Sequence, residues 1–319
     1  MAVRLCRFRH SGKVQIGIYD ESFVIPMSAL AAAGQEIAGS TGFPKTDCLL
    51  TYLPHGSAHA AAAKLADWAA GEGASAVSQA KLATEEVELL VPIPRPNKLF
   101  LLAGNYAKHI EEGGEMARER AETFPYVFMK PPSTTLTDPA KAIRIPSISP
   151  NHIDWELELA IVIGREAKGV SESDALDYVA GFTIVNDISN RKFKPNPQRI
   201  ERPKDGFFDW LHGKWHDSFC ACGPCVTSAD AIADPQSLDM KLAVNDQIKQ
   251  DASTAQQIFP VAAVIEFVSS FVTLEPGDIL STGTPAGVGN ATGDYLKAGD
   301  FIRASIDLIG TLETPVDAE

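Results

Sequence analysis

The sequence predicts an α+β protein in which a small N-terminal α+β domain precedes a larger second domain. Short runs of alternating apolar and polar residues, which are typical of half-buried strands, recur along the chain. Helical patterns are fewer, and the clearest are an alanine-rich stretch at residues 56–71 and an amphipathic stretch at residues 261–272. A proline-rich stretch at residues 92–96 indicates a stiff linker, so we place the domains at residues 1–92 and 93–319.

Charge and composition argue against several classes of function. The formal net charge of −13 argues against nucleic acid or an anionic membrane as the main partner. No apolar run approaches the roughly 20 residues of a membrane span. The first five residues, Met1 to Leu5, lack the apolar core of a signal peptide and lead directly into a strand pattern. Five cysteines, an odd number, favour a reducing compartment, so we expect a cytoplasmic protein.

The N-terminal domain begins with three short alternating runs, at residues 3–5, 14–18 and 23–25. Polar turns separate these runs, so they predict a small antiparallel meander. The alanine-rich helix follows, and a strand at residues 87–91 leads into the proline-rich linker.

After the linker, residues 98–103 predict a strand that ends at Gly104. The next segment, residues 109–120, is charged, poor in core residues and interrupted by two glycines, which favours a solvated helix or a mobile loop. His109 and Glu112 are three residues apart and would lie on one face of a helical turn.

Residues 154–164 predict a buried β-strand that ends at Gly164. Because side chains alternate across a strand, one face carries Trp155, Leu157, Leu159, Ile161 and Ile163. The other face carries Glu156 and Glu158 and continues into the core with Ala160 and Val162. Two neighbouring carboxylates at the end of a buried strand would repel, and a divalent cation would resolve the repulsion. The alternative is an edge strand with two solvated glutamates.

A second strand, at residues 180–187, ends in Asn186 and Asp187. Residues 171–178, between the two strands, resemble a capping box that opens a short helix. If the strands pair, Asp187 would meet Glu156 and Glu158, and the three carboxylates would form a metal site. The alternative for Asp187 is an ordinary turn residue.

Five further segments can be distinguished after the second strand. In chain order they are a polar excursion at 194–211, a hairpin at 238–249 turning at Asn245-Asp246, the helix at 261–272, a strand at 279–281 and a last strand at 301–308. The glycine-rich loop at residues 283–289 lacks the Gly-Lys-Ser/Thr ending of a phosphate loop, so we expect no nucleotide cofactor. Its glycines instead let the backbone approach a ligand closely.

Six motifs occur in the order in which the fumarylacetoacetate hydrolase superfamily carries them, between about residues 95 and 310. They are Gly104-Asn105-Tyr106-Ala107-Lys108-His109, Phe128-Met129-Lys130-Pro131, the Glu156/Glu158 strand, Val185-Asn186-Asp187-Ile188-Ser189, Gly213-Lys214 and Ser281-Thr282-Gly283-Thr284-Pro285-Ala286-Gly287-Val288-Gly289. The chain therefore resembles this superfamily, and in particular its acylpyruvases and 2-hydroxyhepta-2,4-diene-1,7-dioate isomerases. The resemblance implies a mixed, mostly antiparallel β-sandwich roll for residues 93–319 and a homodimer.

The resemblance also implies roles for individual residues. It implies that Mg²⁺ or Mn²⁺, with Ca²⁺ as a further option, is bound by Glu156, Glu158 and Asp187. A dyad of His109 and Glu112 on a lid would act in catalysis together with Lys214. The substrate would be bound by Lys130, Arg191, Gly283 and Thr284. Where the family often has Asp and Gln after the arginine, this chain has Lys192 and Lys194, which leaves the substrate open.

The activity that the resemblance implies is metal-dependent cleavage of a carbon–carbon bond in a β-dicarbonyl 2-oxo acid, such as an acylpyruvate, in aromatic or sugar-acid catabolism. Decarboxylation, tautomerisation, isomerisation or dehydration of a related 2-oxo acid is the first alternative. A non-catalytic, ligand-binding protein is the second, and its only support is the pair Lys192 and Lys194.

Overall fold

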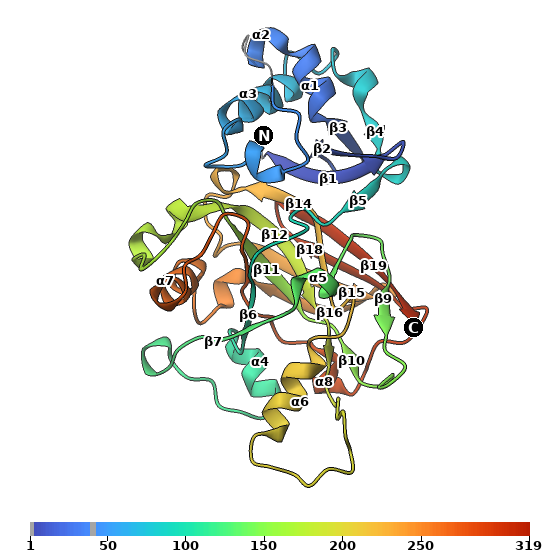
Figure 1. The fold of residues 1–319 in the computed structure, drawn as a ribbon, viewed down its shortest axis with the longest axis vertical. Coiled ribbons are helices and arrows are strands. Elements are labelled where there is room, and N and C mark those ends of the chain that lie inside the picture. Colours follow the sequence, from blue (N-terminus) through green and yellow to red (C-terminus); the bar gives the residue numbers. More distant parts are fainter. Residues whose placement is uncertain (1–2, 39–42) are drawn as a thin grey trace.

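The computed structural model describes residues 3–38 and 43–319, so Met1 and Ala2 of the predicted start lie outside the described residues. Within these ranges the largest sheet has 12 strands, in the order β4-β3-β2-β1-β14-β12-β11-β17-β6-β7, with β5 beside β1 and β8 beside β14 (Figure 1). Its strands are β1 (Arg4–His10), β2 (Lys13–Tyr19), β3 (Phe23–Pro26), β4 (Leu82–Ala83), β5 (Glu88–Leu90), β6 (Leu99–Ala103), β7 (Tyr126–Met129), β8 (Leu136–Thr137), β11 (Leu157–Ile163), β12 (Val179–Asp187), β14 (Cys220–Ser228) and β17 (Ile279–Ser281).

A second sheet lies against the first and completes a sandwich. In the described part of the chain it has five strands, in the order β16-β15-β18-β19-β9. They are β9 (Ile143–Ile145), β15 (Asp239–Val244), β16 (Gln247–Ser253), β18 (Phe301–Ile306) and β19 (Gly310–Ala318). A separate pair joins β10 (Ile153–Asp154) and β13 (Ser189–Asn190). Most neighbouring strands are antiparallel, and β6–β17, β8–β14 and β9–β19 are parallel.

Short helices surround the sheets, and most lie at the two ends of the molecule (Figure 1). The α-helices are α1 (Met27–Ala33), α2 (Gln35–Ala38), α3 (His59–Ala70), α4 (Ala107–Glu112), α5 (Pro132–Thr135), α6 (Asp205–Gly213), α7 (Val261–Phe271) and α8 (Gly289–Thr292). The 3₁₀ helices are η1 (Leu49–Tyr52), η2 (Ser78–Ala80), η3 (Thr84–Glu86), η4 (Arg120–Glu122), η5 (Glu172–Tyr178), η6 (Ala229–Ala231) and η7 (Thr254–Gln256). A search of the described residues finds no helix with the length and apolar character that a membrane crossing requires.

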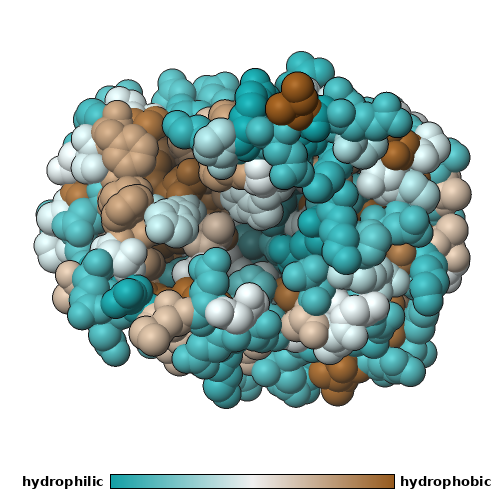
Figure 2. Space-filling view, turned by 90° about the horizontal axis from the view of Figure 1, so that it is seen from below, coloured by the Kyte–Doolittle hydropathy of each residue, from teal (hydrophilic) through white to brown (hydrophobic). Residues whose placement is uncertain are grey.

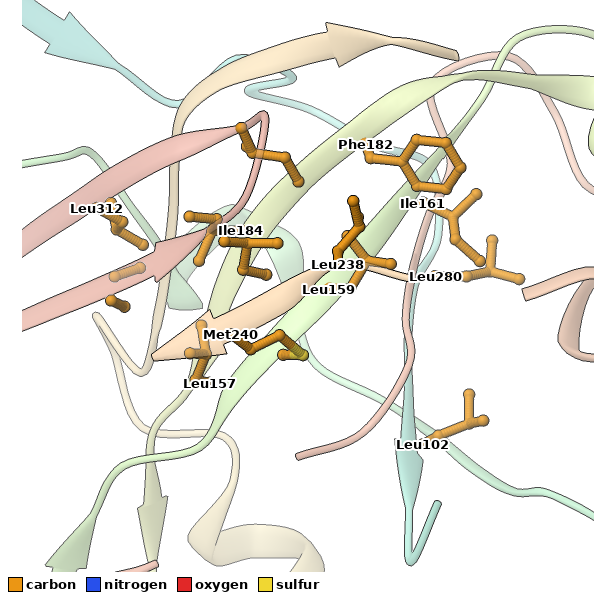
Figure 3. Packing of buried hydrophobic residues seen from close by; sticks show 14 of the residues in the cluster. Leu102, Leu157, Leu159, Ile161, Phe182, Ile184, Leu238, Met240, Leu280 and Leu312 are labelled. Atoms are coloured by element: carbon orange, nitrogen blue, oxygen red, sulfur yellow. The ribbon is translucent and has the colours of Figure 1, made fainter. Parts of the chain in front are cut away.

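The two faces of β11 lie in two different cores, as the alternation of its side chains predicts. Leu157, Leu159 and Ile161 pack between the two sheets with Phe182 and Ile184 of β12 (Figure 3). The opposite face carries its side chains into a second core, which α1 and α3 cover. A strand buried on both faces cannot slip in register without moving every apolar side chain out of its core. The register of β11 is therefore strongly specified, and β11 carries Glu158.

The predicted meander, the alanine-rich helix, the Asn245-Asp246 hairpin and the amphipathic helix are all present, and the α+β fold class is confirmed. The large sheet is continuous across the predicted domain boundary at residue 92. Arg4 and Leu5 of β1 pair with Thr227 and Val226 of β14. The N-terminal elements occupy one end of the molecule, whereas α4, α6 and α8 gather at the opposite end (Figure 1).

The predicted strand at residues 154–164 is wrong in one respect, because it is interrupted at Trp155 and Glu156. At this interruption, backbone amides donate hydrogen bonds to side chains instead of to the backbone of a neighbouring strand. The Glu156 amide donates to Asn186 Oδ1 at 2.9 Å, and the Leu157 amide donates to Gln250 Oε1 at 3.0 Å. The chain can therefore leave the large sheet and pair as β10 with β13.

Three further expectations need correction. The segment at 171–178 is the 3₁₀ helix η5, and the Ser171 hydroxyl bonds the Asp174 carboxylate at 2.8 Å instead of capping the backbone. The polar excursion at 194–211 contains most of α6, whose Trp210 and Leu211 pack against the second core. The last strand ends at Ile306, and the chain turns back as β19, which the alternation pattern did not predict.

Candidate active site

The three predicted metal ligands converge where β11 and β12 pair. Leu157 lies opposite Asn186, so Glu156 and Asp187 are neighbours just beyond this pair, and the Asp187 amide donates to the Glu156 carbonyl at 2.8 Å. One carboxylate oxygen from each of Glu156, Glu158 and Asp187 lies within 4.8 Å of the others, and all three side chains are buried. The alternatives of solvated glutamates and of an ordinary turn at Asp187 do not fit this burial.

Two buried lysines contact the carboxylates. Lys214 follows α6 and donates from Nζ to Glu156 Oε2 at 2.7 Å and to Asp187 Oδ2 at 2.6 Å. Lys130 forms an ion pair with the other oxygen of Asp187 and donates to the Ile188 carbonyl at 2.9 Å. Lys130 thus supports Asp187 from behind, and its ammonium group is fully shielded from solvent.

Arg191 follows β13 and contacts both Glu156 and a fourth buried acid, Asp154. Its Nε donates to Asp154 Oδ2 at 2.7 Å, and its Nη2 lies 2.6 Å from Glu156 Oε1. Asp154 also accepts from the amides of Gly289 at 2.6 Å and Asn290 at 2.9 Å. Asp154 therefore connects Arg191 to the start of α8.

Asp154 was not among the predicted site residues, although it stands two residues before Glu156. An acidic residue at the start of a predicted buried strand is the signal that could have identified it. Its partners could not be predicted, since Arg191 and Gly289 are distant in the chain.

The surroundings give the carboxylates different acidities. Burial raises the pKa of Glu158 well above its ordinary value, and the negative charges of Asp187 and Glu156 raise it further. Burial also opposes ionisation of Glu156, but the charges of Arg191 and Lys214 outweigh it and lower the pKa of Glu156. For Asp187 burial prevails over the two lysines, and its pKa is raised. Burial favours neutral Lys214, yet Asp187 and Glu156 prevail and raise the pKa of its ammonium group.

The donor set fits a hard divalent cation. Glu158 accepts one hydrogen bond, from the Gly283 amide at 3.0 Å, while its Oε1 is buried and accepts none from the described residues. Asp154, Glu156 and Asp187 each have a basic partner, but within the described chain Glu158 has none. A buried carboxylate oxygen without a partner, next to two further carboxylates, matches the oxygen ligands of Mg²⁺, Mn²⁺ and Ca²⁺.

His109 and Glu112 form the predicted pair on α4. His109 Nδ1 lies 2.9 Å from Glu112 Oε1. The same carboxylate accepts from the Gly287 amide, at 3.0 Å to Oε2 and 3.2 Å to Oε1. This bond joins α4 to the glycine-rich loop. Helix α4 has no buried residue, as expected of a solvated helix, and the mobility of the segment stays a prediction. The residues after it, 113–116, are exposed.

A small cavity of about 60 Å³ joins these groups. Of the predicted site residues, its walls include His109, Glu156, Arg191, Lys214 and Thr284. A wider cavity of about 220 Å³ adjoins it and shares His109 and Arg191, with Glu112 in its wall. Of the predicted catalytic residues, His109 and Lys214 therefore line the small cavity, and Glu112 lines the adjoining one with His109.

Two predicted substrate-binding residues are placed differently. Lys130 lies behind Asp187, and Gly283 contributes its amide to Glu158. Thr284 does face the cavity, and its hydroxyl accepts a hydrogen bond from Gln250 Nε2 at 2.9 Å. Trp210 of α6 also lines the cavity and was not predicted. Lys192 and Lys194 are exposed and lie outside both cavities, so they do not block the site.

Residues 98–317 match the family described as fumarylacetoacetate (FAA) hydrolase, C-terminal. The chain belongs to this family. Fumarylacetoacetate hydrolase superfamily members include hydrolases, isomerases and tautomerases, so this is a protein of an enzyme family, and the resemblance in the sequence motifs is confirmed.

Individual members of the family differ in the reaction that their names give. An oxaloacetate tautomerase of Xenopus laevis, described as mitochondrial, is 39% identical over 238 residues, which are 74% of this chain and 70% of that protein. A 2,4-didehydro-3-deoxy-L-rhamnonate hydrolase of Sphingomonas sp. (strain SKA58) is 39% identical over 246 residues, 76% of this chain and 81% of that protein.

A solved structure of maleylpyruvate hydrolase from Sphingobium sp. SYK-6, in complex with manganese (II) ion and pyruvate, has 28% sequence identity and a TM-score of 0.69. The similarity covers 99% of both chains. A neighbour with bound manganese is consistent with a divalent-cation site. The cytoplasmic location and the homodimer remain predictions.

Proposed function

We propose that the protein is a divalent-cation-dependent hydrolase that cleaves a carbon–carbon bond in a β-dicarbonyl 2-oxo acid, such as an acylpyruvate. The observation that carries the proposal is the shared cavity. It places an imidazole, held by a carboxylate, beside Glu156 of the buried acidic group. Such a cleavage requires an acid–base residue close to a bound cation.

Glu156, Glu158 and Asp187 would hold Mg²⁺ or Mn²⁺, since their oxygens converge and Glu158 Oε1 has no partner among the described residues. A cation bound there supplies a Lewis acid that draws electron density from the 2-oxo group. The manganese and pyruvate in the maleylpyruvate hydrolase structure support both the ion and the 2-oxo acid.

His109 would act as the general base. Glu112 holds Nδ1, so Nε2 is free to take a proton from water, whose oxygen then bonds to the distal carbonyl carbon. The bond between that carbon and its neighbour breaks, and its electron pair stays on the 2-oxo acid fragment as an enolate. The imidazolium returns the proton to the enolate carbon. Water is consumed, and a carboxylic acid and a shorter 2-oxo acid are released.

Arg191, Lys214 and Thr284 would bind the substrate's negative charge. All three line the cavity, where Lys214 and Thr284 are buried and the Arg191 side chain is 13% exposed, so few water molecules compete for their donors. Lys214 and Arg191 remain cationic because the neighbouring acids raise the pKa of each, against the effect of burial. A 2-oxo acid carboxylate that enters the cavity would therefore meet two cationic side chains, which also contact Asp154, Glu156 and Asp187.

Tautomerisation of an oxaloacetate-like acid is the second candidate, and the 39% identity to an oxaloacetate tautomerase favours it. The same imidazole would move a proton between a carbon and an enol oxygen, without a water molecule. The site geometry serves both reactions.

The test is an assay of acetylpyruvate cleavage and of oxaloacetate keto–enol exchange, followed by absorbance, with Mn²⁺, with Mg²⁺ and after chelation. We expect acetylpyruvate to be cleaved to acetate and pyruvate, with loss of activity on chelation. Exchange of oxaloacetate without any cleavage of acylpyruvates would replace the first candidate by the second. Neither reaction, in protein that retains its metal, would overturn both.

A further inference from the structure

An apolar groove of about 870 Å³ begins beside the catalytic cavity and runs along the same end of the molecule. Its floor contains Phe128 and Phe259, which are 8% and 6% exposed, and its rim contains Phe124 and Phe271, at 58% and 56%. Figure 2 shows hydrophobic side chains gathered beside a hollow on this face. Large exposed aromatic side chains around a concave surface are typical of a binding site.

The groove and the catalytic cavity adjoin each other. Ala103, Gly104 and Trp210 line both. Gly104 lies at the junction with a φ of +65°, a backbone conformation that favours glycine, and a Cβ there would make only an ordinary contact with Ile110 of α4, at 3.6 Å. Trp210 stands at the other side, with its ring 5.0 Å from that of Phe128 in an edge-on arrangement.

The two spaces differ in size and character. The catalytic cavity, at about 60 Å³, is lined by charged groups and has room for little more than a 2-oxo acid head group. The groove falls within the roughly 300–1,000 Å³ of small-molecule sites and is walled mainly by aromatic and aliphatic side chains. Its two charged lining residues, Glu115 and Arg118, have opposite signs, so the groove presents no net charge to a ligand.

We propose that this groove binds an apolar acyl chain at the distal end of the substrate. The substrate class is then a 2-oxo acid with a long aliphatic or aromatic tail, rather than a four-carbon diacid. The inference rests on the proposed function for the head group of the substrate, while the groove supplies specificity for the tail.

Binding of saturated 2-oxo acids tests the inference without turnover. Dissociation constants for pyruvate, 2-oxohexanoate and 2-oxodecanoate are measured by calorimetry with Mn²⁺ present. We expect binding to tighten about fourfold for each methylene that enters the groove, which is the usual effect of burying a methylene. Acylpyruvates of increasing chain length should show the same trend in kcat/KM.

Rim variants identify the groove as the origin of the trend. Phe124→Ser and Phe271→Ser should flatten the dependence on chain length while leaving pyruvate binding unchanged. Phe208→Ser is the matched control, because Phe208 is 46% exposed on α6 but does not line the groove. It should leave the dependence intact.

Affinity that does not vary with chain length in the parent protein would overturn the inference. So would a chain-length dependence that survives in both rim variants. If those variants instead reduce the oligomer size in sedimentation, with chain-length dependence unaltered, a second copy of the chain covers the groove and the inference is wrong. Graded binding without cleavage of any acylpyruvate would uphold the groove and overturn the hydrolase proposal, so the two failures are distinguishable.

Discussion

Glu158 is the buried acid for which the described structure offers no basic partner, and its pKa is raised by burial and by the two neighbouring acids. We predict that Glu158→Gln abolishes retention of a divalent cation, since it removes the charge but keeps an acceptor for the Gly283 amide. The midpoint of thermal unfolding of the cation-free protein should not fall, because a neutral amide is easier to bury than a carboxylate.

Metal content by mass spectrometry checks this prediction. Glu111→Gln, an exposed change on α4, is the control and should retain the ion. Equal metal content in the two variants would remove Glu158 from the site.

His109 lies beside the acidic group, but in the described structure its hydrogen-bond partner is Glu112 and not Glu156, Glu158 or Asp187. We therefore predict that His109→Ala lowers acetylpyruvate turnover by roughly 10²–10⁴-fold, the usual effect of losing an acid–base group. Cation affinity should be unchanged. Glu112→Gln should act in the same direction, because the imidazolium loses its negative partner. Turnover is measured together with metal content, and a His109→Ala variant as fast as the parent protein would refute the dyad.

At the scale of the element, the glycine-rich loop positions α4. Gly287 has φ +100°, and a Cβ there would lie 2.0 Å from the Lys249 carbonyl oxygen. Gly287→Ala must therefore displace the loop and break its bonds to Glu112. We predict a loss of turnover and a fall in the free energy of unfolding larger than the strain of a left-handed residue alone, which costs about 1–2 kcal/mol.

Gly293→Ala provides the comparison, because Gly293 also has a positive φ, +75°, but nothing lies within 4 Å of the added Cβ. Urea denaturation and kcat of the two variants separate strain from displacement. Equal effects in both would mean that the loop tolerates the side chain and that Glu112 is held by other contacts.

The elements near the site show where sequence patterns suffice and where they do not. Alternation over residues 154–164 predicted both faces of β11, because a strand buried on both sides admits one register. The interruption at Trp155 was not predicted, since it depends on the side chains of Asn186 and Gln250, which are distant in sequence. Helix α6 was not predicted because prolines and charged residues precede it. The packing partners of its apolar residues come from distant parts of the chain.

Among the site residues, the three carboxylates could be predicted from local pattern and strand pairing. The placement of Lys130 behind Asp187 could not, because Lys130 follows β7, which is separated from β12 by three strands of the sheet. The roles of His109 and Glu112 came from the family resemblance, and their 2.9 Å contact agrees with it.

At the scale of the whole molecule, the N-terminal strands are part of the large sheet. Leu5 of β1 pairs with Val226 of β14, and both side chains are fully buried. We predict that a fragment of residues 93–319 aggregates when expressed alone, because the edge of β14 and the core beneath α1 and α3 would be exposed. The full chain should unfold in one cooperative transition.

Soluble yield, size-exclusion chromatography and calorimetry check this expectation. A fragment that is monodisperse and shows its own sharp transition would instead support two independent domains with a boundary at residue 92.

The ammonium group of Lys214 donates hydrogen bonds to both Glu156 and Asp187. This contact bears on whether the chain folds before or after it binds a metal ion. In many small metalloproteins the site forms only as the ion binds, so that folding waits for the metal. If Glu156, Glu158 and Asp187 bind a cation as proposed, the Lys214 ammonium group would neutralise part of their charge before the ion arrives. Folding would then not have to wait for the metal. A cell short of the ion would accumulate folded protein that is ready to bind it.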